Sequence, residues 1–67
     1  MTKIKQAENP NTPKEAFIKL AEDKNWDVRR GVAENPNTPI ETLIKMLLTE
    51  NNADIIKELR ERLKWKR

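Results

Sequence analysis

The hydrophobic positions of this chain recur with the spacing of amphipathic helices, and prolines mark where two of those helices begin. Between Pro13 and about Glu22, one apolar face is formed by Ala16, Phe17, Leu20 and Ala21. Ile18 lies about 100° off that face. From Pro39 to about Thr49 the pattern recurs with a richer apolar set: Ile40, Leu43, Ile44, Met46, Leu47 and Leu48. Side chains three and four residues apart share a helix face, so the pattern predicts two α-helices.

A shorter helix is predicted between these two. Asp27 has the character of an N-cap for a helix that ends near Ala33. One turn apart, Val28 and Val32 point inward, and the pattern places two cations on the outer side: Arg29 and Arg30. Trp26 directly precedes this predicted helix and has two interpretations. It forms a hydrophobic staple, packed on the first turn of the helix, or it is an exposed aromatic side chain that binds a partner. Packing is the favoured one.

The last predicted helix runs over about 53–66, since neither proline nor glycine interrupts it. Its core-facing stripe consists of Ile55, Ile56, Leu59 and Leu63. Trp65 falls outside the stripe, among Lys64, Lys66 and Arg67. Two interpretations are open here as well. Either this tail contacts a partner, or the helix frays after Leu63 and Trp65 folds back on the surface of the protein. The second interpretation is slightly favoured.

The seven residues AENPNTP occur twice, at 7–13 and 33–39, an offset of 26 residues. The similarity extends further, because 10 of 14 positions are identical between 7–20 and 33–46. A fixed period of this length indicates stacked helical units. In each copy, Asn-Pro-Asn predicts a tight turn. The following Thr-Pro-x-Glu, at Thr12 and Thr38, predicts a capping box in which the threonine accepts from the first helical turn.

The segment DVRRGVAENPNTPIETL, from Asp27 to Leu43, resembles the variant leucine-rich repeat family. The resemblance covers about 7–48 and implies an all-α, right-handed solenoid of alternating α- and short 3₁₀ helices. It implies a fold rather than a reaction. In these terms residues 1–67 form a single domain, with unit one at about 7–32, unit two at about 33–58 and a longer C-terminal capping helix at about 53–66. The first six residues are a degenerate half-unit, with Ala7 packed inward.

Composition excludes several kinds of chemistry. The chain of 67 residues has no cysteine and no histidine. Thiolate metal sites, the usual zinc ligands and the commonest general base are therefore missing, and we expect no catalysis, no metal and no cofactor. No apolar run approaches the roughly 20 residues that span a bilayer, and the start lacks the apolar stretch of a signal peptide. We therefore expect no membrane association and a cytoplasmic location.

The net charge of +3 is unevenly distributed, because residues 1–50 are balanced and residues 51–67 carry six basic and three acidic side chains. The leading hypothesis is a protein-interaction module, with self-association as a related possibility. Its candidate surface consists of the repeated outward positions Lys14, Ile18, Lys19, Arg29, Arg30, Ile44 and Lys45. The alternative is weak, salt-dependent nucleic-acid binding through Arg29, Arg30 and the basic tail Lys64, Trp65, Lys66 and Arg67.

Overall fold

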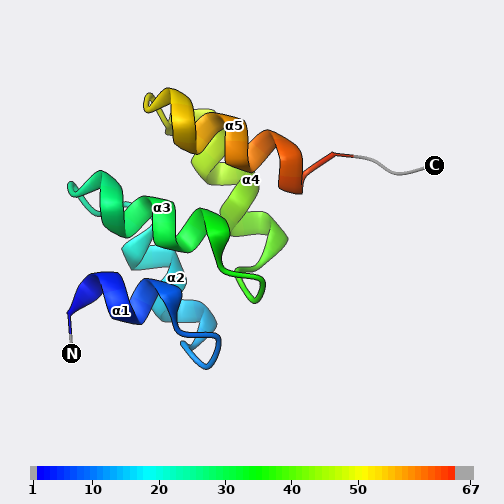
Figure 1. The fold of residues 1–67 in the computed structure, drawn as a ribbon. Coiled ribbons are helices and arrows are strands. Elements are labelled where there is room, and N and C mark those ends of the chain that lie inside the picture. The colour runs from blue at the N-terminus through cyan, green and yellow to red at the C-terminus, as the bar shows by residue number, and fades with distance from the viewer. Residues whose placement is uncertain (1, 65–67) are drawn as a thin grey trace.

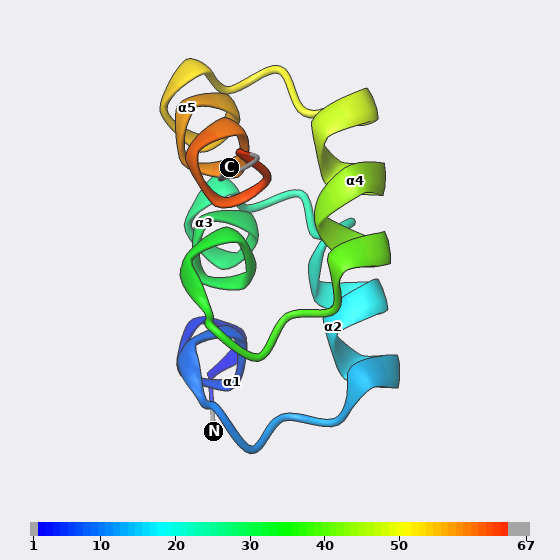
Figure 2. The same cartoon turned by 90° about the vertical axis from the view of Figure 1, so that its right-hand side faces the viewer.

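The computed structural model describes residues 2–64, which form five α-helices in two layers. One layer contains α1 (Lys3–Glu8), α3 (Trp26–Glu34) and α5 (Ala53–Arg62), stacked side by side (Figure 1). The other contains α2 (Lys14–Leu20) and α4 (Ile40–Thr49), which follow one another along the stack (Figure 2). Residues 2–64 contain no strand, so the predicted all-helical architecture is confirmed. The short helices of the first layer are α-helical rather than 3₁₀.

Asparagine side chains cap the N-termini of α3 and α5. Asn25 precedes α3, and its side chain accepts a hydrogen bond from the Asp27 amide at 2.9 Å. Asn52 does the same for α5, accepting from the amides of Asp54 and Ile55. The prediction that Asp27 is the N-cap is therefore wrong, because Asp27 lies in the first turn. The repeated Asn-x-Asp, 27 residues apart, was the available signal.

The predicted capping boxes are also wrong. Helices α2 and α4 begin directly after Pro13 and Pro39, and neither has a side-chain cap. The threonine hydroxyls instead donate backward, from Thr12 to the Gln6 carbonyl at 2.5 Å and from Thr38 to the Val32 carbonyl at 2.6 Å. The Asn-Pro turn folds each threonine against the end of the preceding helix, where, among residues 2–64, the only backbone donor to each carbonyl is the amide of the following asparagine at 3.3 Å. Each threonine therefore ties two consecutive helices together.

The core is one cluster between the layers. Its buried members are Ala7, Phe17, Leu20, Val28, Val32, Ala33, Leu43, Met46, Ile55 and Leu59. This confirms the inward positions predicted on α2 and α3 and the inward packing of Ala7, while Leu47 is only partly buried against the cluster. On α5 the prediction holds for Ile55, Leu59 and the partly buried Leu63 but is wrong for Ile56, which does not pack against the cluster. The apolar face predicted for α4 is wrong in part. Ile40, Ile44 and Leu48 are exposed, because α4 meets the core through its other side.

A ladder of side-chain hydrogen bonds joins the units of the first layer. The Asn35 carboxamide, 2% exposed, donates to the carbonyls of Ala7 at 2.8 Å and Asn9 at 2.9 Å. At the matching carbonyls of the next unit, Ala33 and Asn35, the donor is the Arg62 guanidinium, at 2.8 and 2.6 Å. Asn35 therefore donates to carbonyls at the end of α1, and Arg62 donates to the equivalent carbonyls at the end of α3.

Helix α5, the third helix of its layer, is shorter than predicted. It begins at Ala53 as expected but ends at Arg62, with Leu63 as the C-cap. The helix therefore does not continue toward residue 66 through Lys64, and it is ten residues long against nine for α3. Trp65, Lys66 and Arg67 lie outside the described residues.

Candidate interaction surface

The layer of α2 and α4 carries a set of exposed hydrophobic side chains. On α4, Ile40, Ile44 and Leu48 are 64%, 46% and 79% exposed, and their four-residue spacing places them along one face. We call these three residues the α4 stripe. On α2, Ile18 is 49% exposed, as its position off the predicted core face indicated. The apolar residues of this layer therefore point both into the core and into solvent.

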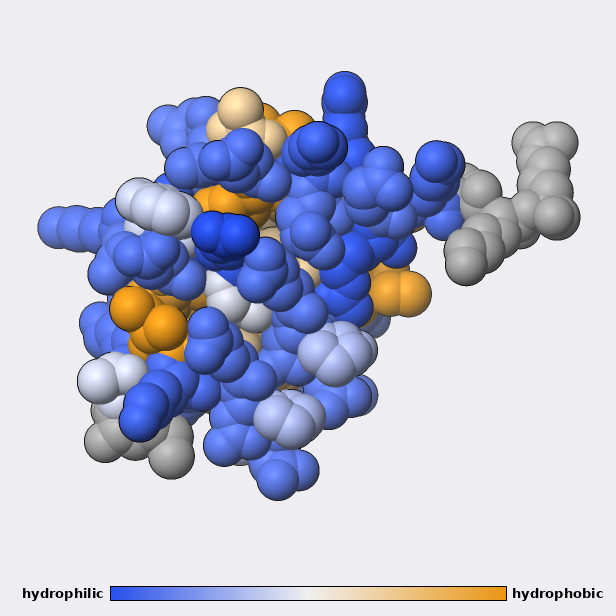
Figure 3. All heavy atoms as spheres, viewed as in Figure 1, coloured by the Kyte–Doolittle hydropathy of each residue, from blue (hydrophilic) through white to orange (hydrophobic). Residues whose placement is uncertain are grey.

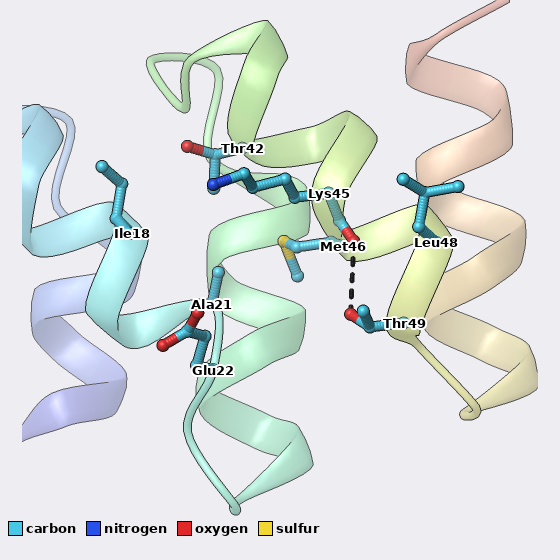
Figure 4. A pocket seen from close by; sticks show the side chains of 8 residues that line it. All are labelled: Ile18, Ala21, Glu22, Thr42, Lys45, Met46, Leu48 and Thr49. Carbon is cyan, nitrogen blue, oxygen red and sulfur yellow. Dashed lines mark hydrogen bonds between the residues drawn. The ribbon is translucent and has the colours of Figure 1, made fainter.

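Between α2 and α4 lies a groove of about 340 Å³. Figure 4 shows its α2 side, formed by Ile18, Ala21 and Glu22 near the end of that helix. The other side comes from α4: Thr42, Lys45, Met46, Leu48 and Thr49. Met46 is buried in the core cluster, so the groove reaches down to the core. The lining is predominantly apolar with one cation and one carboxylate at its rim, Lys45 and Glu22.

The structure brings most of the predicted surface residues into this layer. Lys14, Ile18 and Lys19 lie on α2, and Ile44 and Lys45 lie on α4, all exposed. Ile18 and Lys45 line the same groove although they are far apart in sequence. Figure 2 shows that α2 and α4, the helices that carry these residues, lie on the same side of the molecule.

Arg29 does not point outward, and that prediction is wrong. Its side chain is 18% exposed and forms a two-pronged ion pair with Glu50, with Nε–Oε1 at 2.9 Å and Nη2–Oε2 at 3.1 Å. Its Nη1 also donates to the carbonyls of Asp23 and Lys24. These carbonyls follow the end of α2 and need a donor, which the guanidinium supplies. Arg29 thus joins α3 to the ends of both α2 and α4.

The Glu50 carboxylate in this pair is 2% exposed. Burial acts to raise its pKa, but the hydrogen bond from Arg29 and those from the Asn52 and Asn51 amides lower it by more. The net result is a pKa below the ordinary value of a glutamate. Glu50 is therefore held as a charged structural group, which the sequence pattern did not indicate.

The remaining sequence candidates lie on the other layer or beyond it. Arg30 is exposed on α3 and pairs with Glu34 at 3.1 Å. Trp26 begins α3 and is 43% exposed, so the preferred staple interpretation, a side chain packed away on the first turn, is wrong. The face formed by α1, α3 and α5 is mostly hydrophilic, with scattered hydrophobic patches (Figure 3). Lys64 is exposed beyond α5, whereas Trp65, Lys66 and Arg67 fall outside the described part of the chain.

Alignment of the two units shows which exposed residues are unusual. At an offset of 26, Ile40 takes the place of Lys14 and Leu48 takes the place of Glu22. Both first-unit residues are exposed and charged, as expected of solvent-facing positions. The second unit therefore has hydrophobic side chains where the fold itself accepts charged ones. This comparison was available from sequence, but the richer apolar pattern on α4 was assigned to the core instead.

Two further observations concern residues 2–64. They contain no cluster of three or more potential ligands of the histidine, cysteine or carboxylate type that could hold a metal ion. None of their helices combines the length and apolar character that crossing a membrane requires.

Helices stacked in two layers and joined by recurring Asn-Pro turns define a helical repeat protein. The model of the leucine rich repeat variant family matches residues 26–47, which contain α3, the second turn and most of α4. The match confirms the resemblance: the chain carries a leucine rich repeat variant unit. Among curated proteins and among solved structures, no significant match to the chain was found.

Proposed function

We propose that this chain is a non-enzymatic interaction module that binds a protein partner, either a different protein or a further copy of itself, through the α2–α4 layer. The observation that supports this proposal is the α4 stripe, in which Ile40 and Leu48 are hydrophobic where the first unit is charged. Contiguous exposed apolar surface on a small protein marks a binding site, since burying it on a partner is favourable. Ile18 and the groove extend this surface, and the lysines at its edge, Lys14, Lys19 and Lys45, favour a partner with acidic groups beside its apolar ones.

The absence of an enzymatic role is part of the proposal and rests on chemistry. The sequence has neither histidine nor cysteine, and the buried carboxylate Glu50 is engaged by Arg29. A catalytic group needs a free proton or lone pair near a substrate, which this ion pair does not offer. A cytoplasmic location belongs to the same proposal and rests on the sequence alone.

Nucleic-acid binding is the weaker alternative. Of its two helical cations, Arg29 is saturated by Glu50 and two carbonyls, which leaves Arg30 and the basic tail to meet phosphates. Such binding would be electrostatic and would fall steeply with salt.

The test is affinity capture from lysate of the native host, with and without nuclease, using wild-type chain, Leu48→Lys and Lys57→Glu as baits. Lys57 is exposed on α5, in the other layer, and serves as the control. We expect at least one protein to be retained by wild type and by the control, lost with Leu48→Lys and insensitive to nuclease. Capture that nuclease abolishes would favour the alternative, and capture unaffected by Leu48→Lys would contradict the proposed surface. Circular dichroism verifies that all baits are folded.

A further inference from the structure

We propose that the partner of the α4 stripe is a second copy of this chain, packed antiparallel across a twofold axis near Ile44. The inference rests on the proposed function and names the occupant of the same surface. It follows from the spacing and charge pattern of α4, which are self-complementary.

The spacing meets the requirement of a symmetric interface, in which the same patch serves both subunits. Ile40 and Leu48 are each four residues from Ile44. When two α4 helices pack antiparallel with Ile44 opposite Ile44, Ile40 of each copy therefore lies opposite Leu48 of the other. All three exposed hydrophobic residues of the stripe gain an apolar partner in this arrangement.

The charges beside the stripe fit the same arrangement. Glu41 and Lys45 are exposed on one edge of the stripe, and neither forms an ion pair within residues 2–64. A twofold axis perpendicular to both helices keeps this edge on the same side, so Glu41 of one copy lies beside Lys45 of the other. Along the helix axis the two are offset by roughly 3 Å, two residues of helical rise. Two opposite-charge pairs form, one at each end of the symmetric interface.

Other arrangements lose this complementarity. In a parallel pair the charged edge of one helix meets the opposite edge of the other, where the adjacent residue is Leu47. In the first unit, the row equivalent to the stripe is Lys14, Ile18 and Glu22, so Ile18 is its only hydrophobic member. The equivalent charges Glu15 and Lys19 therefore lie beside a largely charged row. Only α4 combines an apolar stripe with a self-complementary edge among the described helices. A single helix pair buries less than the roughly 1,600 Å² of a standard interface, so the dimer should be weak and concentration dependent.

Charge reversal on α4 tests the geometry. The variants are Glu41→Lys, Lys45→Glu and the double swap, each studied by sedimentation equilibrium over a series of concentrations at low salt. Like charges meet in each single variant, and we expect its self-association to weaken at least about tenfold. An equimolar mixture of the two single variants should associate as well as wild type, and so should the double swap. Glu15→Lys and Lys19→Glu on α2 are the matched controls and should leave association unchanged.

The outcomes separate this inference from the proposed function. A wild-type chain that stays monomeric throughout, or a dimer indifferent to both single reversals, would overturn the inference. Loss in both single variants without recovery in the mixture would also overturn it, because the inferred geometry brings the two reversed edges together and makes them complementary. In each of these cases the capture experiment still decides whether another protein uses the surface. Thermal unfolding is recorded by circular dichroism for every variant. Curves that match the wild-type curve exclude misfolding as the cause of weaker association.

Discussion

Glu50 and Arg29 form the most enclosed ionic contact described in this chain, with side chains 2% and 18% exposed. Because the guanidinium also donates to Asp23 and Lys24, one side chain closes the ends of two helices. The pKa of Glu50 is lower in the folded chain than in the unfolded chain, where its ordinary value is 4.5. The stabilisation is therefore fully present above pH 4.5 and disappears as the pH falls through the lower, folded-state pKa.

The first prediction follows from this linkage. Glu50→Gln should lower the free energy of unfolding at pH 7 by about 1–3 kcal/mol, because Arg29 loses its counter-charge. The difference from wild type should shrink as the pH falls below 4.5, where wild-type Glu50 also becomes neutral. Urea titrations at several pH values measure this, with the exposed Glu61→Gln as control. A difference that stays constant with pH would show that the carboxylate charge is not the cause.

At the scale of elements, α1 and α3 approach closely at Gly31. A Cβ built on Gly31 would lie 2.8 Å from the Ala7 Cβ, closer than packed side chains tolerate. Since the Ala7 Cβ is attached directly to the backbone of α1, relief requires the helix to move. The asparagine ladder depends on the same approach, because Asn35 reaches the Ala7 carbonyl across these helices. Glycine at this position therefore sets the spacing of the first two units.

The second prediction concerns that spacing. Gly31→Ala should destabilise the chain, since overpacking costs about 1–3 kcal/mol and the better helix propensity of alanine offsets at most about 1 kcal/mol. In an Ala7→Gly background the same substitution should cost less, because the clashing methyl group is gone. A double-mutant cycle from chemical unfolding measures the coupling. Equal costs in both backgrounds would mean that the two helices are not in close contact there.

At the scale of the whole molecule, the chain is an elongated stack of 38 × 23 × 15 Å with a single thin core. The last helix is part of that core rather than an appendage, because Ile55 and Leu59 are both 0% exposed. Arg62 adds hydrogen bonds to the end of α3. So short a chain has little stability to spare, which makes each fully buried side chain a large fraction of the total.

The third prediction tests the role of α5. Leu59→Ala should cost about 2–5 kcal/mol, enough to unfold much of the population. Leu48→Ala, at a 79% exposed position, should change stability by no more than about 0.5 kcal/mol. Both are measured by urea denaturation at a concentration where the chain is monomeric. A cooperative, near-wild-type transition for Leu59→Ala would place the core elsewhere.

Local sequence was sufficient to predict most of the fold. Prolines and asparagines located the two turns, and helical periodicity identified the inward residues on α2 and α3 and all but Ile56 on α5, because both signals depend only on neighbouring residues. The repeat then related the two units and pointed to the family whose model matches residues 26–47. The exposure of Ile18 followed from the same periodicity. These features were determined by the sequence itself.

Tertiary contacts decided the rest. Thr12 and Thr38 fit a capping box locally, but the turn places a carbonyl six residues back within closer reach. Arg29 looked like a surface cation until folding brought Glu50, 21 residues away, beside it. Whether Ile40 and Leu48 face core or solvent depended on which side of α4 the other helices cover, and periodicity alone cannot choose between two apolar faces. The partners of Arg29 and of α4 are distant in sequence, so only the assembled stack could specify them, whereas the partner of each threonine depends on the path of the intervening turn.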